Sequence, residues 1–144
     1  MADGAVHRVG SLATVWRGVR RRCGRCGWRP IGEGFFGLKE HCPNCGYRFR
    51  REEGFFTGVY LVNFSVTIAI LWVVVMAYTL WSAIRDESGA LAPVLAVGVA
   101  IAVVVPIAFY STAATTWAAL DLVLRPLEPD EEAEAALWAS PDDG

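Results

Sequence analysis

The sequence predicts an α-helical membrane protein in which two transmembrane helices form a hairpin behind a small cysteine-rich ribbon. Three observations lead to this fold class. Two long segments, 55–84 and 88–120, contain no charged residue. Two Cys-x-x-Cys pairs and most of the basic residues precede the first of these segments. Only 19% of the 144 residues are charged, whereas soluble domains usually contain about 25%.

Each uncharged segment is long enough to cross a bilayer, because a hydrocarbon core of about 30 Å requires about 20 apolar residues in a helix. We predict transmembrane helices at 55–84 and 91–111, joined by an external loop at 85–90. The second helix should begin near Pro93, and Pro106 should kink it or end its regular part. The alternative is a buried hairpin in a soluble protein, but too few polar residues remain to cover it. Neither span contains an ionisable side chain, which argues against an ion or proton pathway.

The basic residues are distributed very unevenly along the chain. The first 55 residues contain eleven of the 13 basic residues and five acids, whereas the connection between the spans has one basic residue, Arg85. Because Lys and Arg beside a span tend to remain in the cytoplasm, we expect both termini to be cytoplasmic and the protein to lie in the inner cell membrane. Residues 1–29 contain seven arginines and no apolar run of a signal peptide, so the first span is expected to remain uncleaved. The aromatic residues expected at the inner and outer edges of that span are Phe55, Phe56 and Tyr60, and Tyr78 and Trp81, respectively.

The two thiol pairs have the spacing of a structural zinc site. Cys23-x-x-Cys26 and Cys42-x-x-Cys45 are separated by 15 residues, which agrees with the pattern C-x2-C-x15–20-C-x2-C. Zn²⁺ takes four tetrahedral ligands with Zn–S near 2.3 Å, and four thiolates leave no open position for catalysis. We therefore predict that all four cysteines bind one structural Zn²⁺.

The pairs lie in a predicted zinc ribbon at residues 20–50. The residues between the pairs suffice for a strand, a turn and a return strand, with Phe35 and Phe36 at the turn. So short a unit usually needs a metal or disulfides to fold, and zinc binding supplies folding energy. Structural disulfides, a thioredoxin-like pair and rubredoxin-type iron are the alternatives; the expected reducing compartment disfavours the first. His41 is placed near the site or in solvent, His7 in a solvated tail, and Gly24, Gly27 and Gly46 are expected to ease the turns.

Three further segments flank the ribbon and the two spans. Residues 1–19 form a basic arm, in which Leu12, Val15, Trp16 and Val19 have helical spacing. This helix is expected either on the membrane surface, where Arg20, Arg21 and Arg22 could meet anionic headgroups, or packed on the ribbon. Residues 112–126 are predicted as an interfacial helix with a surface pair between Asp121 and Arg125. Residues 127–144 are an acidic tail that is either helical at 130–138 or disordered.

Small residues recur at four-residue spacing in the second span. This pattern permits close helix packing, either within the hairpin or in a homo-oligomer, and the sequence leaves both open. The residues are Ala92, Ala96, Gly98 and Ala100.

The stretch RCGRCGWRPIGEGFFGLKEHCPNCGYRFRREEG, followed by an apolar hairpin and the ending W-x-ALDLVLRPLEP, resembles an uncharacterised bacterial family of small two-helix membrane proteins. The resemblance covers about residues 18–127. It implies a zinc-ribbon-like double CxxC motif, residence in the bacterial inner membrane and no assigned catalysis. Some relatives are encoded near haem–copper oxidase genes, which implies a role in assembling a respiratory complex. Not every relative keeps all four cysteines.

Together these features predict a non-enzymatic protein. We expect a membrane-anchored zinc ribbon that acts as a scaffold, adaptor or assembly factor for another protein. Metal handling or assembly for a respiratory membrane complex is the alternative, and membrane-tethered nucleic-acid binding is a weaker one, since positive-inside anchoring already explains the arginines. The sequence shows no general base, activated nucleophile or open metal site.

Overall fold

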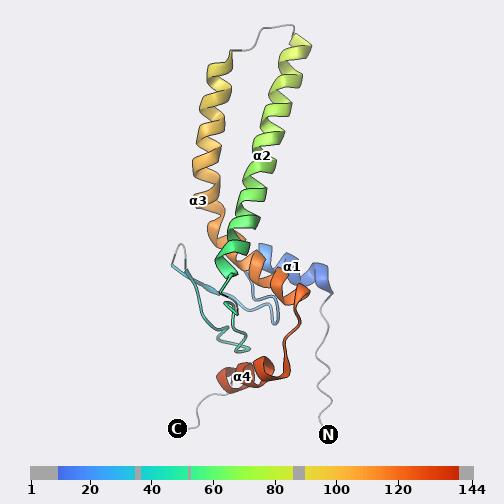
Figure 1. Ribbon diagram of the computed structural model, residues 1–144, viewed down its shortest axis with the longest axis vertical. Helices are drawn as coiled ribbons and strands as arrows, with labels where there is room; N and C mark the ends of the chain where they lie inside the picture. The colour runs from blue at the N-terminus through green and yellow to red at the C-terminus, as the bar shows by residue number, and fades with distance from the viewer. Residues whose placement is uncertain (1–9, 35–36, 52, 86–89, 140–144) are drawn as a thin grey trace.

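The structure is a computed structural model that describes residues 10–34, 37–51, 53–85 and 90–139. The two longest helices run side by side along the longest axis of the molecule, and the other elements lie at one end of them (Figure 1). In chain order they are α1 (Ser11–Val19), β1 (Gly32–Glu33), β2 (Gly37–Leu38), α2 (Phe55–Arg85), α3 (Leu91–Leu124) and α4 (Pro129–Ala139).

Helices α2 and α3 form the hairpin and are long and apolar enough to cross a membrane. They contain 31 and 34 residues, which at 1.5 Å per residue correspond to about 46 and 51 Å. Large apolar side chains are exposed over the outer surface of the hairpin, among them Leu61, Phe64, Leu80, Leu95 and Val99. In water such a surface would be unfavourable, because burial of apolar area is the main driving force of folding.

Helix α3 is one continuous helix, whereas the sequence predicts a transmembrane helix at 91–111 and a separate interfacial helix at 112–126. Pro106 lies inside α3 without ending it, and Figure 1 shows that the lower part of α3 turns away from the axis of its upper part. The helix ends at Leu124 because Arg125 is extended, as expected for a residue that precedes a proline. The side-chain amide of Asn63 in α2 donates to the carbonyl oxygen of Pro106 at 2.9 Å.

The buried core lies at the base of the hairpin, where the ribbon meets the two long helices. Residues of the lower part of α3 with small side chains let other elements approach closely, and Phe55 and Val59 of α2 pack into the same cluster. Phe55 was expected at the membrane edge, but it is buried because it faces this core. Phe56 and Tyr60 are exposed, as an edge position requires.

Helix α1 packs across the lower part of α3. Its contact face consists of Thr14 and Gly18, which are buried, while Leu12 and Trp16 are exposed. The structure therefore shows packing mainly on α3, which neither alternative from the sequence had named. Whether the exposed side meets a membrane is addressed below.

The C-terminal acidic segment forms α4, in agreement with the helical alternative for residues 130–138. Acids in its first turn face the positive end of the helix dipole. Of the small residues in α3, Gly98 faces Leu71 of α2, whereas Ala92, Ala96 and Ala100 are exposed, so a homo-oligomer stays a prediction. Phe35, Phe36, His7 and most of the loop at 85–90 lie outside the described residues.

Candidate metal centre

The two Cys-x-x-Cys-Gly segments fold into turns with the same backbone pattern, here called the first and second knuckles (residues 23–28 and 42–47). The amide of Gly27 donates to the carbonyl of Cys23 at 2.8 Å, and that of Gly46 donates to Cys42 at 2.9 Å. The first cysteine of each knuckle donates to the carbonyl of the aromatic residue that ends it, Trp28 or Tyr47. Gly27 and Gly46 have φ values of +79° and +66°, a conformation that glycine adopts without steric cost.

The knuckles bring the four thiols together. The Sγ atoms of Cys23, Cys26, Cys42 and Cys45 all lie within 4.8 Å of one another. The Cys23–Cys45 distance is 3.8 Å and the Cys26–Cys42 distance is 3.6 Å. These values are close to the edge of about 3.8 Å of a tetrahedron with Zn–S near 2.3 Å, and they are far longer than a disulfide of about 2.05 Å. The donor set and its geometry therefore suit one tetrahedral metal ion.

The clustered thiols strongly perturb one another. Hydrogen bonds from Cys23 and then Cys45 lower the pKa of the Cys42 thiol to about 2. Hydrogen bonding to Cys42 raises the pKa of the Cys23 thiol. A site that stabilises a thiolate among neighbouring thiols favours a cation at its centre, because a thiolate is the form that binds metals.

The first knuckle is held against α1 and α3. A Cβ added at Gly24 would lie 3.2 Å from Thr14 Cγ2 and 3.4 Å from the Cα of Ala119. Gly24 was expected to have a positive φ, but its φ is not positive. Its missing side chain instead lets the first knuckle pack closely on α1 and α3. The side chain of Arg17 reaches over the same knuckle and donates to the carbonyl of Arg25 at 3.3 Å.

The second knuckle is fixed to α3 by Tyr47. Its ring is 1% exposed, and its hydroxyl donates to the carbonyl of Ala118 at 3.3 Å. Burial raises the pKa of this hydroxyl, so it remains protonated and able to donate. Phe49, which follows, is equally buried and meets Tyr47 edge to face. The thiol cluster and the base of the hairpin thus share one hydrophobic core.

Arg51 joins the end of the ribbon to both C-terminal helices. Its side chain is only 7% exposed. Its guanidinium donates to Asp121 of α3 at 2.7 and 3.2 Å, to Glu131 of α4 at 2.9 Å and to the carbonyl of Arg125 at 2.9 Å. Asp121 was expected at the surface beside Arg125, but it is buried and paired with Arg51.

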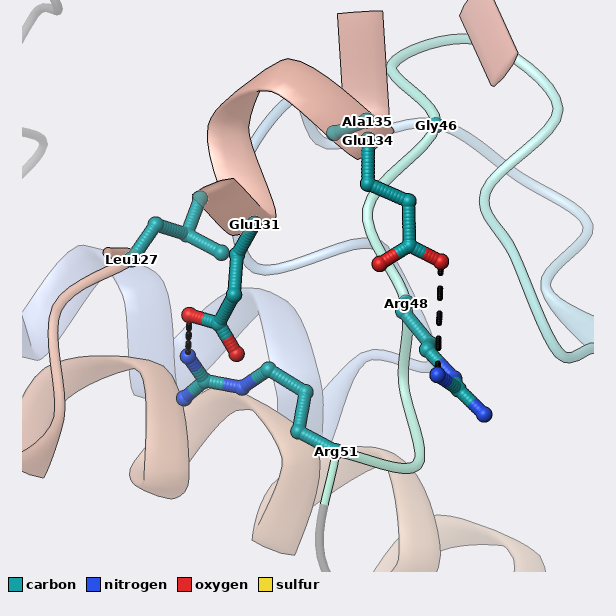
Figure 2. Close-up of a pocket in the computed structure, with 7 residues that line it drawn as sticks. All are labelled: Gly46, Arg48, Arg51, Leu127, Glu131, Glu134 and Ala135. Carbon is teal, nitrogen blue, oxygen red and sulfur yellow. Dashed lines mark hydrogen bonds and ion pairs between the residues drawn. The ribbon is translucent and has the colours of Figure 1, made fainter. Parts of the chain in front are cut away.

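Helix α4 covers the second knuckle. Ala135 is buried, and its backbone lies against Gly46, where a Cβ would overlap it. A cavity of about 170 Å³ lies where α4 faces the end of the ribbon. Figure 2 shows that Arg51 points to Glu131 and Arg48 points to Glu134 there. The residues that line the cavity are Gly46, Arg48, Arg51, Leu127, Glu131, Glu134 and Ala135.

His41 belongs to this covered surface and not to the thiol cluster. Its ring stacks on Trp138 with centroids 4.3 Å apart, and its Nε2 lies 3.6 Å from a Glu134 oxygen. His41, which was expected near the site or in solvent, therefore lies beside the thiol cluster and is covered by α4.

The spacing of the four cysteines predicts the thiol cluster but not the residues that fix it to the helices. Tyr47 and Arg51 received no role from the sequence, because their partners Ala118 and Asp121 lie about 70 residues later. One signal was available: the second knuckle repeats the pattern Cys-Gly-aromatic of the first, which marks Tyr47 as a residue at a fixed place in the turn.

One protein-family model matches the chain. The family model described as "Protein of unknown function (DUF983)" matches residues 33–117, which include the second knuckle, α2 and most of α3. The match begins after Cys23 and Cys26. No curated protein and no solved structure matches the chain. Because the family model covers more than half of its residues, the chain belongs to the DUF983 family of proteins of unknown function.

Proposed function

We propose that this protein is a non-enzymatic, membrane-anchored zinc-ribbon protein that serves as a scaffold, adaptor or assembly factor for another protein. The observation that carries the proposal is the single core shared by the thiol cluster and the base of two membrane-length helices. This shared core fixes the position and orientation of the ribbon relative to the hairpin. A fixed recognition surface lowers the entropic cost of binding a partner.

The hairpin is proposed to span the inner cell membrane with both termini in the cytoplasm. The exposed apolar surface of α2 and α3 supports insertion. The basic N-terminal part of the chain supports a cytoplasmic ribbon, since Lys and Arg stay on the cytoplasmic side. Figure 1 is consistent with this topology, because α1 and α4, the first and last helices, lie at the same end, away from the hairpin tip.

The metal is proposed to be structural Zn²⁺ bound by Cys23, Cys26, Cys42 and Cys45. Four thiolates close the tetrahedron, so the ion would have no open position for substrate. Cys23 and Cys42 are 0% and 1% exposed. This burial favours a metal that is retained over one that is delivered to another protein.

The uncovered surface of the ribbon is proposed to receive the partner. The second knuckle is covered by α4, whereas the first exposes Trp28, and Arg29 directly after it is also exposed. Tryptophan and arginine are the residue types that most often dominate binding energy in protein interfaces. A partner seated on Trp28 would contact the chain beside the metal, and loss of the metal would disturb its binding site.

The test is purification of the full chain from membranes after crosslinking, with metal analysis of each sample. We expect bound zinc in the wild type and in Asn44→Ser, an exposed change in the same knuckle, and loss of zinc in Cys42→Ser. Trp28→Ala should keep zinc but lose the crosslinked partner. The scaffold role is wrong if wild type, Cys42→Ser and Trp28→Ala recover the same partners. The topology is wrong if the knuckles are labelled from outside intact cells.

A further inference from the structure

Helix α1 exposes its apolar side. Leu12 is 89% exposed, Trp16 56% and Val19 38%. A helix on a soluble protein normally turns its apolar stripe toward the core and its polar face outward. The arrangement in α1 is the reverse, so its outer face needs an apolar environment that the described residues do not supply.

The contact with α3 fixes this orientation. A Cβ at Gly18 would lie 2.6 Å from the Cβ of Ala119, and the Thr115 hydroxyl donates to the carbonyl of Gly18 at 2.8 Å. Only a glycine permits so close an approach of the two helices. At 3.6 residues per turn, Trp16 lies on the opposite side of α1 from the face formed by Thr14 and Gly18. The apolar side chains therefore point outward as long as this contact holds.

The outer face of α1 lies at the level where the apolar surface of the hairpin begins. Figure 1 shows α1 crosswise to the hairpin at its base, at the end where α2 starts. The first turns of α2 expose Phe56 and Tyr60 at that end. Amphipathic aromatic rings are enriched at the boundary between headgroups and acyl chains. The exposed side of α1 therefore lies at the same level along the hairpin as the proposed membrane boundary.

The charges beside this face point to an anionic surface. Arg20, Arg21 and Arg22 directly follow α1 and are exposed. The guanidinium of Arg20 lies over the Trp16 ring, 4.9 Å from its centroid. Arginine next to an apolar helical face is typical of helices that lie in the interface of anionic membranes.

We propose that α1 lies in the headgroup region of the cytoplasmic leaflet, with Leu12, Trp16 and Val19 among the upper acyl-chain segments and Arg20, Arg21 and Arg22 on anionic phospholipid headgroups. This inference rests on the proposed insertion of the hairpin. Because Thr14 of α1 contacts Gly24 of the first knuckle, lipid binding by α1 sets the height of the metal centre above the bilayer.

The test uses the full chain reconstituted into vesicles of phosphatidylcholine alone or mixed with phosphatidylglycerol, with bromine on the acyl chains near the headgroup. The fluorescence of Trp16 is obtained as the difference between wild type and Trp16→Phe. We expect bromine to quench it, more strongly in the anionic vesicles. Replacement of Arg20, Arg21 and Arg22 by glutamine should remove this preference, with about a five-fold loss of partitioning per arginine.

Trp138 supplies the matched control. It is 62% exposed, similar to Trp16, but lies on α4, and the difference between wild type and Trp138→Phe should show no quenching. If the chain remains in vesicles after an alkaline wash but Trp16 is not quenched, α1 faces something other than lipid and the inference fails while insertion stands. Equal quenching in both vesicle types refutes the anionic headgroups. Release by the wash refutes insertion itself, and the inference with it.

Discussion

Replacement of Arg51 is expected to be the most damaging single change outside the cysteines. The side chains of Arg51 and Asp121 are only 7% and 11% exposed. Arg51→Met keeps the aliphatic stem beside Tyr47 but leaves the Asp121 carboxylate buried without its cation. Breaking a buried ion pair by removing one partner costs about 3–5 kcal/mol, which for a chain of this size corresponds to a fall in melting temperature of roughly 10 °C.

Thermal unfolding of the purified full chain in detergent, followed by near-ultraviolet circular dichroism, measures this loss. Arg50→Met is the matched control, because Arg50 is the preceding residue and is exposed; its effect should stay within about 0.5–1 kcal/mol. Arg51→Lys should lose less than Arg51→Met, since an ammonium can still face Asp121 but does not reproduce the fork that also reaches Glu131.

The double variant Arg51→Met with Asp121→Leu separates the pair from its surroundings. It removes both charges, so no buried group is left unpaired, and it should be more stable than Arg51→Met alone. The buried pair is refuted as a source of stability if Arg51→Met is no more destabilising than Arg50→Met. It is also refuted if the loss of stability in the double variant equals the sum of the losses in Arg51→Met and Asp121→Leu.

Two further changes probe the core between the ribbon and the hairpin. Gly58→Ala should destabilise the chain by about 1–3 kcal/mol in the same unfolding assay, because its Cβ would overlap the ring of Trp117 and overpacking forces the core to shift. Gly54→Ala is the control and should leave the melting temperature unchanged, because a Cβ there meets nothing within 4 Å. Equal effects of the two changes would contradict the packing of Gly58 on Trp117. Tyr47→Phe should cost about 1 kcal/mol, because it leaves the buried carbonyl of Ala118 without the hydroxyl donor; an unchanged melting temperature would mean that this bond contributes nothing.

The cluster of four thiols and the two long helices could be predicted from the sequence because each depends on local order along the chain. The spacing Cys-x-x-Cys with a following glycine specifies a turn that places two sulfurs together, and two such turns 15 residues apart can meet. A run of some 30 uncharged residues specifies a long helix by its composition. The bounds of α2, Phe55–Arg85, agree with the predicted span at 55–84.

Helix bounds were predicted less accurately where local sequence signals favoured different structures. Pro106 indicated a kink or the end of the regular helix, and the change of character after Tyr110 indicated a separate helix, yet α3 continues to Leu124. The lower part of α3 is held in helical form because its small residues carry α1 and the ribbon, a contact that no local pattern reveals. Phe55 was predicted at the membrane edge because its side chain is aromatic, but it is buried in the core.

The sequence alone determined the membrane-length hairpin and the four thiols, because composition and short spacing act within one segment of chain. The tertiary structure decided how these parts are joined: Tyr47 on Ala118, Arg51 on Asp121 and Gly18 on Ala119. Each of these contacts links residues about 70 to 100 positions apart, and its existence depends on which faces of two elements meet. Only the folded chain specifies that the thiol cluster is fixed to the base of the hairpin and that α1 turns its apolar side outward.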